Sequence, residues 1–374
     1  MWIALAIMAF LVIAAPFLVR YLNVSETNSH EGRLLPHGFL SIIAWCGFVL
    51  LGFMATAVTT LALVDICRLF FALVHFVLNG TNIDAQAFSP ERRKFIFTYL
   101  PWGAFGAAAL FTAKGFQTAM KGPIVKRVSI PKIKIHPSLE GLKIVQISDL
   151  HIGNLIRRPF VEKVVKTTLA LEPDIIMLTG DMVDGSPAGL ADDIEPLKEL
   201  KAKYGIYFIT GNHEYYSGAK TWSDYFRSQG IEVLSNSHKV LEIKKADVKE
   251  SARLVIAGVP DFTAERFGFE GPDAVKAMKG SPKSDYTIML AHQPNSYRET
   301  EKIECDLQLS GHTHSGQFYP VRFFIGLFQK YYQGLYRHQD KFWIYVNQGT
   351  GFWGPPNRLG LPSEITLLTL RSPE

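Results

Sequence analysis

The chain has 374 residues, with 39 Lys and Arg against 34 Asp and Glu, and its net charge of +5 is unevenly distributed. Residues 1–136 hold 12 basic and 5 acidic side chains, whereas residues 137–374 hold 27 and 29. The larger C-terminal part is nearly neutral, so we expect no nucleic-acid partner, because such a partner requires a basic surface on the folded domain. The three cysteines, Cys46, Cys67 and Cys305, have no disulfide or metal spacing.

The N-terminal third carries three long apolar runs without charge, at residues 2–19, 39–64 and 95–113. The first has 18 residues, close to the length of a membrane-spanning helix, and it lacks the basic start and the cleavage site of a signal peptide. Residues 69–78 continue the second run, so residues 39–78 form either one long helix or a hairpin of two. We therefore expect residues 1–120 to be a transmembrane region of three or four helices in contact with a lipid bilayer.

Asp65 and Arg68 interrupt the second run three residues apart, a spacing that places them on one face of a helix, where they can pair. One such pair and no internal repeat make a weak case for a transporter, which usually needs more helices. The number of spans decides on which side of the membrane the rest of the chain lies, and the basic residues do not settle it. We expect a linker with a first strand at residues 121–140 and a separate domain at residues 141–374.

The C-terminal part consists of short apolar runs that alternate with helical patterns. Runs of this kind are typical of buried strands, and they lie at residues 142–148, 174–179, 205–210, 253–258, 286–291 and 306–310. Residues 158–172 have helical spacing, and so do residues 194–205, which end in Gly205. The alternation predicts an α/β core with both faces of the sheet covered.

Polar side chains follow five of these predicted strands. They are Asp149, His151, Asp181, Asp184, Asn212, His213, His292, His312 and His314. Ligands in open α/β sheets bind beyond the carboxyl ends of the strands, so we expect these side chains to share one rim. Oxygen and imidazole ligands without thiolate suit Mn²⁺, Fe²⁺, Fe³⁺ or Zn²⁺. They are too many for one ion, and a two-metal centre needs a shared carboxylate, for which Asp181 is the natural candidate.

Each of these motifs alone is more often a turn or a helix cap, because Asp and Asn favour loops. His312 and His314 are one residue apart, so on a strand they would point the same way. Five of the eleven histidines follow predicted strand ends, however, and that recurrence favours the metal interpretation.

The motifs "DLH", "GDMVD", "GNHE", a lone histidine and "GHTH" occur in this order. They resemble the signature of the calcineurin-like metallophosphoesterase superfamily over about residues 140–370. The stretches "NHEYYSG", "LSGHTHSGQ" and "NRLGLPSEI" look like its bacterial membrane-anchored subgroup, apart from Ser315, where that subgroup usually has glycine. The resemblance implies a four-layer α/β/β/α sandwich, preceded here by the transmembrane region, and a multi-pass protein of the bacterial plasma membrane.

The resemblance also implies a role for each residue. Asp149, His151 and His314 would hold a first divalent ion, and Asn212, His292 and His312 a second. Asp181 would bridge both ions, so His312 and His314 would serve different ions. His213 would contact the substrate or protonate the leaving group, and Asp184 would support the ligands from behind.

We therefore expect a membrane-anchored phosphoesterase in which a hydroxide bridging two metal ions attacks the phosphorus. Phosphodiester or pyrophosphate bonds, in a lipid or nucleotide-linked substrate, are the expected targets. A phosphomonoesterase or a protein phosphatase on the same site stays open as an alternative. A catalytically silent membrane scaffold is a further alternative, although its usual mark, a lost ligand, is not found. Arg157 and Arg158 follow the first motif and would either bind a second phosphate or begin a solvated helix.

Overall fold

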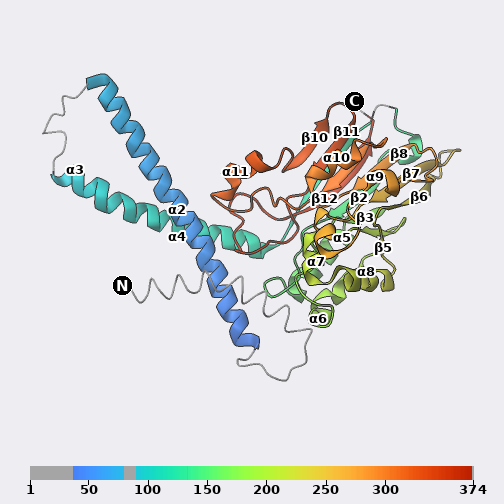
Figure 1. Cartoon of the computed structure of the whole chain (residues 1–374), viewed down its shortest axis with the longest axis horizontal. Helices are drawn as coiled ribbons and strands as arrows, with labels where there is room; N and C mark the ends of the chain where they lie inside the picture. The colour runs from blue at the N-terminus through green and yellow to red at the C-terminus, as the bar shows by residue number, and fades with distance from the viewer. Residues whose placement is uncertain (1–36, 80–89, 133, 373–374) are drawn as a thin grey trace.

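The computed structural model describes residues 37–79, 90–132 and 134–372, and Figure 1 shows a helical arm joined to a domain of two sheets. The apolar run at residues 2–19 therefore lies outside the described residues. The arm consists of α2 (His37–Asn79), α3 (Pro90–Lys94), η2 (Phe95–Tyr99) and α4 (Leu100–Lys121).

The second apolar run forms one continuous helix, α2, and not a hairpin of two helices. Its 43 residues extend about 64 Å at 1.5 Å per residue, roughly twice the hydrocarbon thickness of a bilayer. Asp65 and Arg68 pair on it as predicted, 2.7 Å apart. Among the described residues only α2 is long and apolar enough to cross a membrane, so the structure supports one crossing and gives no support to a multi-pass arrangement.

α4 runs antiparallel to α2 and packs against it. The rings of Phe53 and Phe105 meet edge to face with centroids 5.0 Å apart, and those of Trp45 and Phe116 do so at 6.3 Å. Small side chains, among them Ala108, are buried on α4 and allow this approach.

The domain contains two six-stranded sheets. The first has the order β1 (Ile124–Pro131), β12 (Glu364–Arg371), β2 (Lys143–Ile147), β3 (Ile175–Leu178), β4 (Ile206–Phe208), β5 (Glu232–Val233). The second has the order β10 (Gly334–His338), β11 (Phe342–Val346), β9 (Leu307–Ser310), β8 (Tyr286–Leu290), β7 (Ala252–Gly258), β6 (Ser237–Ile243). β2, β3 and β4 are mutually parallel, as are β7, β8 and β9, so within each set the carboxyl ends share an edge.

Alternation along the strands produces the layers. On β2, Ile144 is buried between the two sheets, whereas Val145 is buried under the helices of the outer face. The side chain of Gln146 donates a hydrogen bond of 3.0 Å to the carbonyl of Ser310 and so ties the two sheets together beside the strand ends.

Helices cover both outer faces. α5 (Arg158–Leu169) and α8 (Ala219–Ser228) bury apolar side chains against the first sheet, with α6 (Ala191–Ile194) and α7 (Asn212–Ser217) beside them. α9 (Ala274–Ala277) and α10 (Tyr297–Thr300) lie on the second sheet, and α11 (Val321–Phe328) lies at its flank. This arrangement confirms the four-layer α/β/β/α prediction, and the six predicted strands are β2, β3, β4, β7, β8 and β9.

The predicted helix at residues 194–205 is wrong. α6 ends at Ile194 and is followed by the 3₁₀ helix η4 (Glu195–Glu199), after which Leu200 is extended. Pro196 lies at the start of η4, where proline is tolerated, so it does not account for the end of the helix at Glu199. Leu197 and Leu200 are nevertheless buried against the first sheet, so the helical spacing predicted the burial of these side chains and not the length of the helix.

Candidate metal centre

The ends of five strands from both sheets deliver the predicted polar side chains to one region. Asp149 and His151 follow β2, Asp181 and Asp184 follow β3, and Asn212 begins α7 shortly after β4. His292 follows β8, and His312 and His314 follow β9. These side chains form three groups of three, and within each group the ligand atoms lie within 4.8 Å of one another. Two of the groups have one histidine in common.

Several of the converging residues have a left-handed backbone. Asp149, His151, Asp181, His312 and His314 have φ between 45° and 69°, a region that residues other than glycine rarely adopt. Each such residue costs about 1–3 kcal/mol and persists only where the surrounding structure fixes it, which is most common at functional sites. The sharp turns after the strands thus aim side chains at one place.

Two glycines make the close approach of these turns possible. A Cβ atom on Gly311 would lie 2.2 Å from Oδ2 of Asp149, and one on Gly211 would lie 2.2 Å from Oδ1 of Asp181. Real Cβ atoms do not approach other atoms so closely, so any other residue would displace a carboxylate of the site. Both glycines precede residues that the sequence identified, Asn212 and His312.

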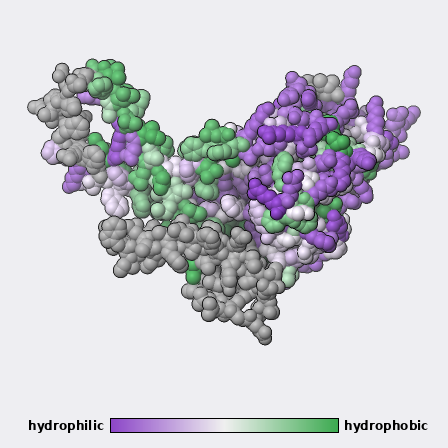
Figure 2. Space-filling view, viewed as in Figure 1, coloured by the Kyte–Doolittle hydropathy of each residue, from purple (hydrophilic) through white to green (hydrophobic). Residues whose placement is uncertain are grey.

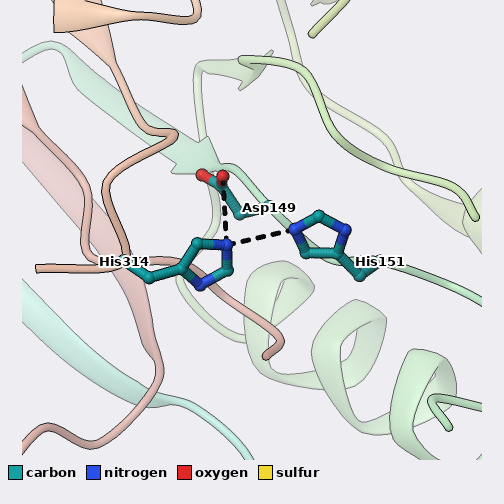
Figure 3. Close-up of side chains that lie close together, drawn as sticks. All are labelled: Asp149, His151 and His314. Carbon is teal, nitrogen blue, oxygen red and sulfur yellow. Dashed lines mark hydrogen bonds and ion pairs between the residues drawn. The ribbon is translucent and has the colours of Figure 1, made fainter. Parts of the chain in front are cut away.

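The first group consists of Asp149, His151 and His314, all buried. Figure 3 shows the carboxylate and the two rings directed toward one another, with Nε2 of His314 3.4 Å from Oδ1 of Asp149 and 3.1 Å from Nε2 of His151. Burial and the guanidinium of Arg358 lower the pKa of His314 well below its ordinary value. The ring is therefore neutral, the form in which imidazole binds a metal ion.

The second group consists of Asp181, His292 and His312. Nδ1 of His292 lies 2.8 Å from the carbonyl oxygen of Thr179 and donates its hydrogen there, which leaves Nε2 facing Oδ2 of Asp181 at 3.0 Å. His312 belongs to this group while His314 belongs to the first, because both lie in a turn of left-handed residues and not on an alternating strand.

One buried atom beside this group, Oδ1 of Asn212, has no hydrogen-bond partner among the described residues, and Nε2 of His292 has only the carboxylate of Asp181. Buried polar atoms are nearly always satisfied, so each such atom needs an explanation. An imidazole nitrogen beside a buried carboxylate and a buried amide oxygen are suitable ligands for a divalent cation. The residues present therefore fit a metal centre.

Asp184 connects the first group to His213. Its carboxylate oxygens lie 3.2 Å from Nδ1 of His151 and 2.5 Å from Nδ1 of His213. Burial alone would raise the pKa of Asp184, but the charges of His213 and His151 outweigh it and hold the pKa well below its usual range. Burial likewise lowers the pKa of His213, but Asp184 and Asp181 overcome this effect and raise it to about 9.

Glu214 is a residue of the site that the sequence reasoning did not single out. Its buried carboxylate accepts hydrogen bonds from the backbone N–H groups of Asp181 (2.9 Å), Met182 (2.7 Å) and Gly211 (2.6 Å). It therefore joins the turn after β3 to the turn after β4. Burial and the charge of Asp181 raise the pKa of Glu214 to about 7. The sequence feature that could have identified Glu214 is its position in "GNHE", directly after the candidates Asn212 and His213.

Arg358 was also missed, although "NRLGLPSEI" was noted. Its fully buried guanidinium lies 2.9 Å from Nδ1 of His314 and donates hydrogen bonds to the carbonyls of Gln348 (2.6 Å) and Gly351 (2.5 Å). The guanidinium can only donate, so Nδ1 of His314 accepts and the hydrogen of the neutral ring lies on Nε2, which the contact holds toward the first group. Burial lowers its pKa to about 10, so it keeps its charge at neutral pH.

Arg157 and Arg158 are not brought to these groups. Arg157 pairs with Asp193 at 2.6 Å, and Arg158 pairs with Glu162 and Glu195, each at 2.7 Å, at the start of α5. These ion pairs agree with the interpretation of both residues as the solvated start of a helix. Substrate binding by either residue stays a prediction without structural support.

Comparisons with known proteins agree with the motifs. The sequence profile of the calcineurin-like phosphoesterase family matches residues 142–316. A transmembrane protein with metallophosphoesterase domain from Danio rerio is 35% identical over 269 residues, 70% of this chain and 61% of that protein. Uncharacterized metallophosphoesterases are similar too: one from Helicobacter pylori is 32% identical over 308 residues, 80% of each chain. One from Aquifex aeolicus is 34% identical over 253 residues, 66% of this chain and 91% of its own.

Proposed function

Because the chain belongs to the calcineurin-like phosphoesterase family, we propose that it is a membrane-anchored hydrolase of phosphodiester or pyrophosphate bonds that works with two divalent metal ions. The observation that carries the proposal is the pair of neighbouring groups of mostly buried nitrogen and oxygen ligands, with Oδ1 of Asn212 left without a hydrogen-bond partner among the described residues. A structural cluster of hydrogen bonds would have satisfied that atom.

The proposed ligands divide between the two groups. Asp149, His151 and His314 would hold the first ion, Asn212, His292 and His312 would hold the second, and Asp181 would be shared by both. Asp181 suits that role because its Oδ2 faces His292 while its Oδ1 accepts a hydrogen bond of 2.8 Å from the backbone N–H of His213. The donor set, without thiolate, favours Mn²⁺, Fe or Zn²⁺.

When bound, two such ions supply positive charge for the phosphoryl oxygens and lower the pKa of water toward neutrality. The chain's own contribution is the placement of a proton donor. In hydrolysis, water adds to phosphorus, the bond from phosphorus to the leaving oxygen breaks, and that oxygen needs a proton. His213 supplies this proton from Nε2 while Asp184 holds Nδ1, and such general acid help is typically worth about 10²–10⁴-fold.

The arm anchors the enzyme. α2 is the one helix of the described residues that crosses the bilayer, and α4 packs against it with Trp102 and Leu110 70% and 73% exposed. Exposed apolar side chains of this size are stable in lipid and unfavourable in water. The membrane that we propose for this anchor is the plasma membrane.

The test is hydrolysis of methyl p-nitrophenyl phosphate, a diester, beside p-nitrophenyl phosphate, a monoester, by the full chain in detergent. The protein is stripped of metal and then supplied with Mn²⁺. Diester hydrolysis that depends on Mn²⁺ is expected. Preference for the monoester would replace the proposal by a phosphomonoesterase, and absence of both activities with two ions bound per chain would favour a silent scaffold.

A further inference from the structure

α11 is a short apolar helix that the domain does not bury. Its sequence is VRFFIGLF, and none of its eight residues is buried. Leu327 and Phe328 are 76% and 75% exposed, and Phe323 and Phe324 are 56% and 51% exposed. Four large apolar side chains on one exposed helix are too many for a surface that meets only water, so this surface has a partner.

α11 is connected to the mouth of the metal centre. It begins seven residues after His314, and between them Gln317 exchanges two hydrogen bonds of 3.0 Å with the backbone of Trp353. The indole of Trp353 is 52% exposed, and its centroid lies 5.8 Å from that of His213. The segment between His314 and α11 is thus tied to the exposed indole that lies beside His213, the side chain proposed to protonate the leaving group.

The loop that carries Trp353 also docks on the helical arm. Nδ2 of Asn357 lies 3.3 Å from Oγ1 of Thr56 on α2, and the backbone N–H of Arg358 donates a hydrogen bond of 3.0 Å to the carbonyl of Gly115 on α4. Arg358 itself holds His314. One short loop thus contacts α2, α4 and the metal centre.

Beyond this docking point the arm is exposed and apolar. α2 has no buried residue from Ile66 to Leu78, and large side chains such as Leu69 and Phe71 are 72% and 70% exposed. Figure 1 shows α11 on the flank of the domain that faces α2 and α4. Figure 2 shows hydrophobic residues over α11 and along the arm, whereas the domain to the right is mainly hydrophilic.

We propose that α11 lies in the interface of the bilayer that α2 crosses, and that with Trp353 it opens the metal centre toward the phosphate group of a membrane lipid. The substrate class is therefore a lipid phosphoester, and this inference rests on the proposed function. Short apolar helices with a tryptophan nearby are typical of membrane interfaces, where the indole has both apolar and polar neighbours.

The bilayer is the occupant that the surroundings favour. The hydrophobic residues over α11 lie on the side of the domain that faces the hydrophobic arm, so a membrane around the arm reaches α11 without a further partner. Arg322 within the helix and Lys330, two residues after its end, supply positive charge for anionic headgroups. The alternatives to the bilayer are a second copy of the chain or the residues before α2. Either of them, lying on α11, would exclude lipid from it.

The experiment compares two diesters with the same leaving group. One is methyl p-nitrophenyl phosphate in solution, and the other is a diacylglyceryl p-nitrophenyl phosphate in vesicles of phosphatidylethanolamine and phosphatidylglycerol that contain the full chain. The variant is Leu327→Glu with Phe328→Glu, two exposed positions that the fold does not need. The matched control is Val275→Glu, an exposed residue on α9 that is 56% accessible.

The lipid diester is expected to have a kcat/KM at least tenfold above that of the soluble one. The α11 variant is expected to lose that preference while its rate on the soluble diester stays within twofold, and Val275→Glu is expected to keep both. Equal rates on the two diesters, or an α11 variant that retains the preference, would overturn the inference and leave the proposed function intact. Hydrolysis of neither diester would instead remove the proposed function and, with it, this inference.

A second measurement reports contact directly. A fluorophore on Leu327→Cys, with the three native cysteines changed to serine, is placed in the same vesicles with brominated acyl chains. Strong quenching is expected for Leu327→Cys and little for Val275→Cys. An unquenched probe at position 327 would mean that protein covers α11, and that result would refute the membrane contact.

Discussion

Changing Glu214 to glutamine tests whether this buried carboxylate holds the turns of the metal centre together. Its Oε2 accepts from the N–H groups of Asp181 and Gly211, and its Oε1 accepts from that of Met182. A glutamine side chain has one carbonyl oxygen, so its NH₂ group faces at least one of these donors. One buried N–H then has no acceptor, which costs about 1–3 kcal/mol.

The loss is measurable as a thermal shift. For a domain of 150–250 residues, 1 kcal/mol corresponds to about 2–4 °C, so Glu214→Gln is expected to lower the unfolding midpoint by about 2–12 °C. Because the turns carry Asp181 and Asn212, metal binding weakens too. Substitutions behind metal ligands typically cost about 10–100-fold in affinity, and we expect a loss of that size for Mn²⁺.

The assay is thermal unfolding of the full chain in detergent, followed by a Mn²⁺ titration of diester hydrolysis. Glu232→Gln is the matched control, because Glu232 is exposed and pairs only with Lys239, at 3.2 Å. Its midpoint should stay almost unchanged, since exposed ion pairs contribute little. A Glu214→Gln protein with the midpoint and Mn²⁺ dependence of the wild type would refute the argument.

The remaining predictions concern single residues around the ligands. Gly311→Ala places a Cβ atom against Oδ2 of Asp149 and is expected to weaken Mn²⁺ binding at least tenfold by calorimetry; unchanged affinity would contradict the close-approach argument. Arg358→Gln frees the His314 ring and is expected to raise the Mn²⁺ concentration for half-maximal hydrolysis about 10–100-fold, and an unaltered titration would count against that anchoring role. His213→Ala is expected to keep both ions while kcat falls about 10²–10⁴-fold; loss of metal would show instead that the ring is a ligand.

The sequence predicted those parts of the fold and site that depend on short stretches. The strands beside the site are short and mainly apolar, and each candidate ligand follows a strand end within a few residues, so period and position sufficed for β2, β3, β4, β8 and β9. Left-handed turns then separate His312 from His314, an outcome that strand alternation alone does not predict.

The parts that the sequence did not predict depend on contacts between distant residues. Glu214 acts on Asp181, 33 residues earlier, and Arg358 acts on His314, 44 residues earlier. Neither contact leaves a local pattern in the chain. The exposure of α11 is of the same kind, because a short helix of mainly apolar residues in the sequence can equally be a buried one.

The most direct test of the account is the metal content of the full chain in detergent after exposure to Mn²⁺ and removal of free metal. The account predicts two ions per wild-type chain, fewer than one in Asp181→Asn, which loses the shared carboxylate, and two in His213→Ala. Failure of the wild-type chain to bind metal would contradict it, because the buried nitrogen and oxygen atoms that converge after the strands would then serve another purpose.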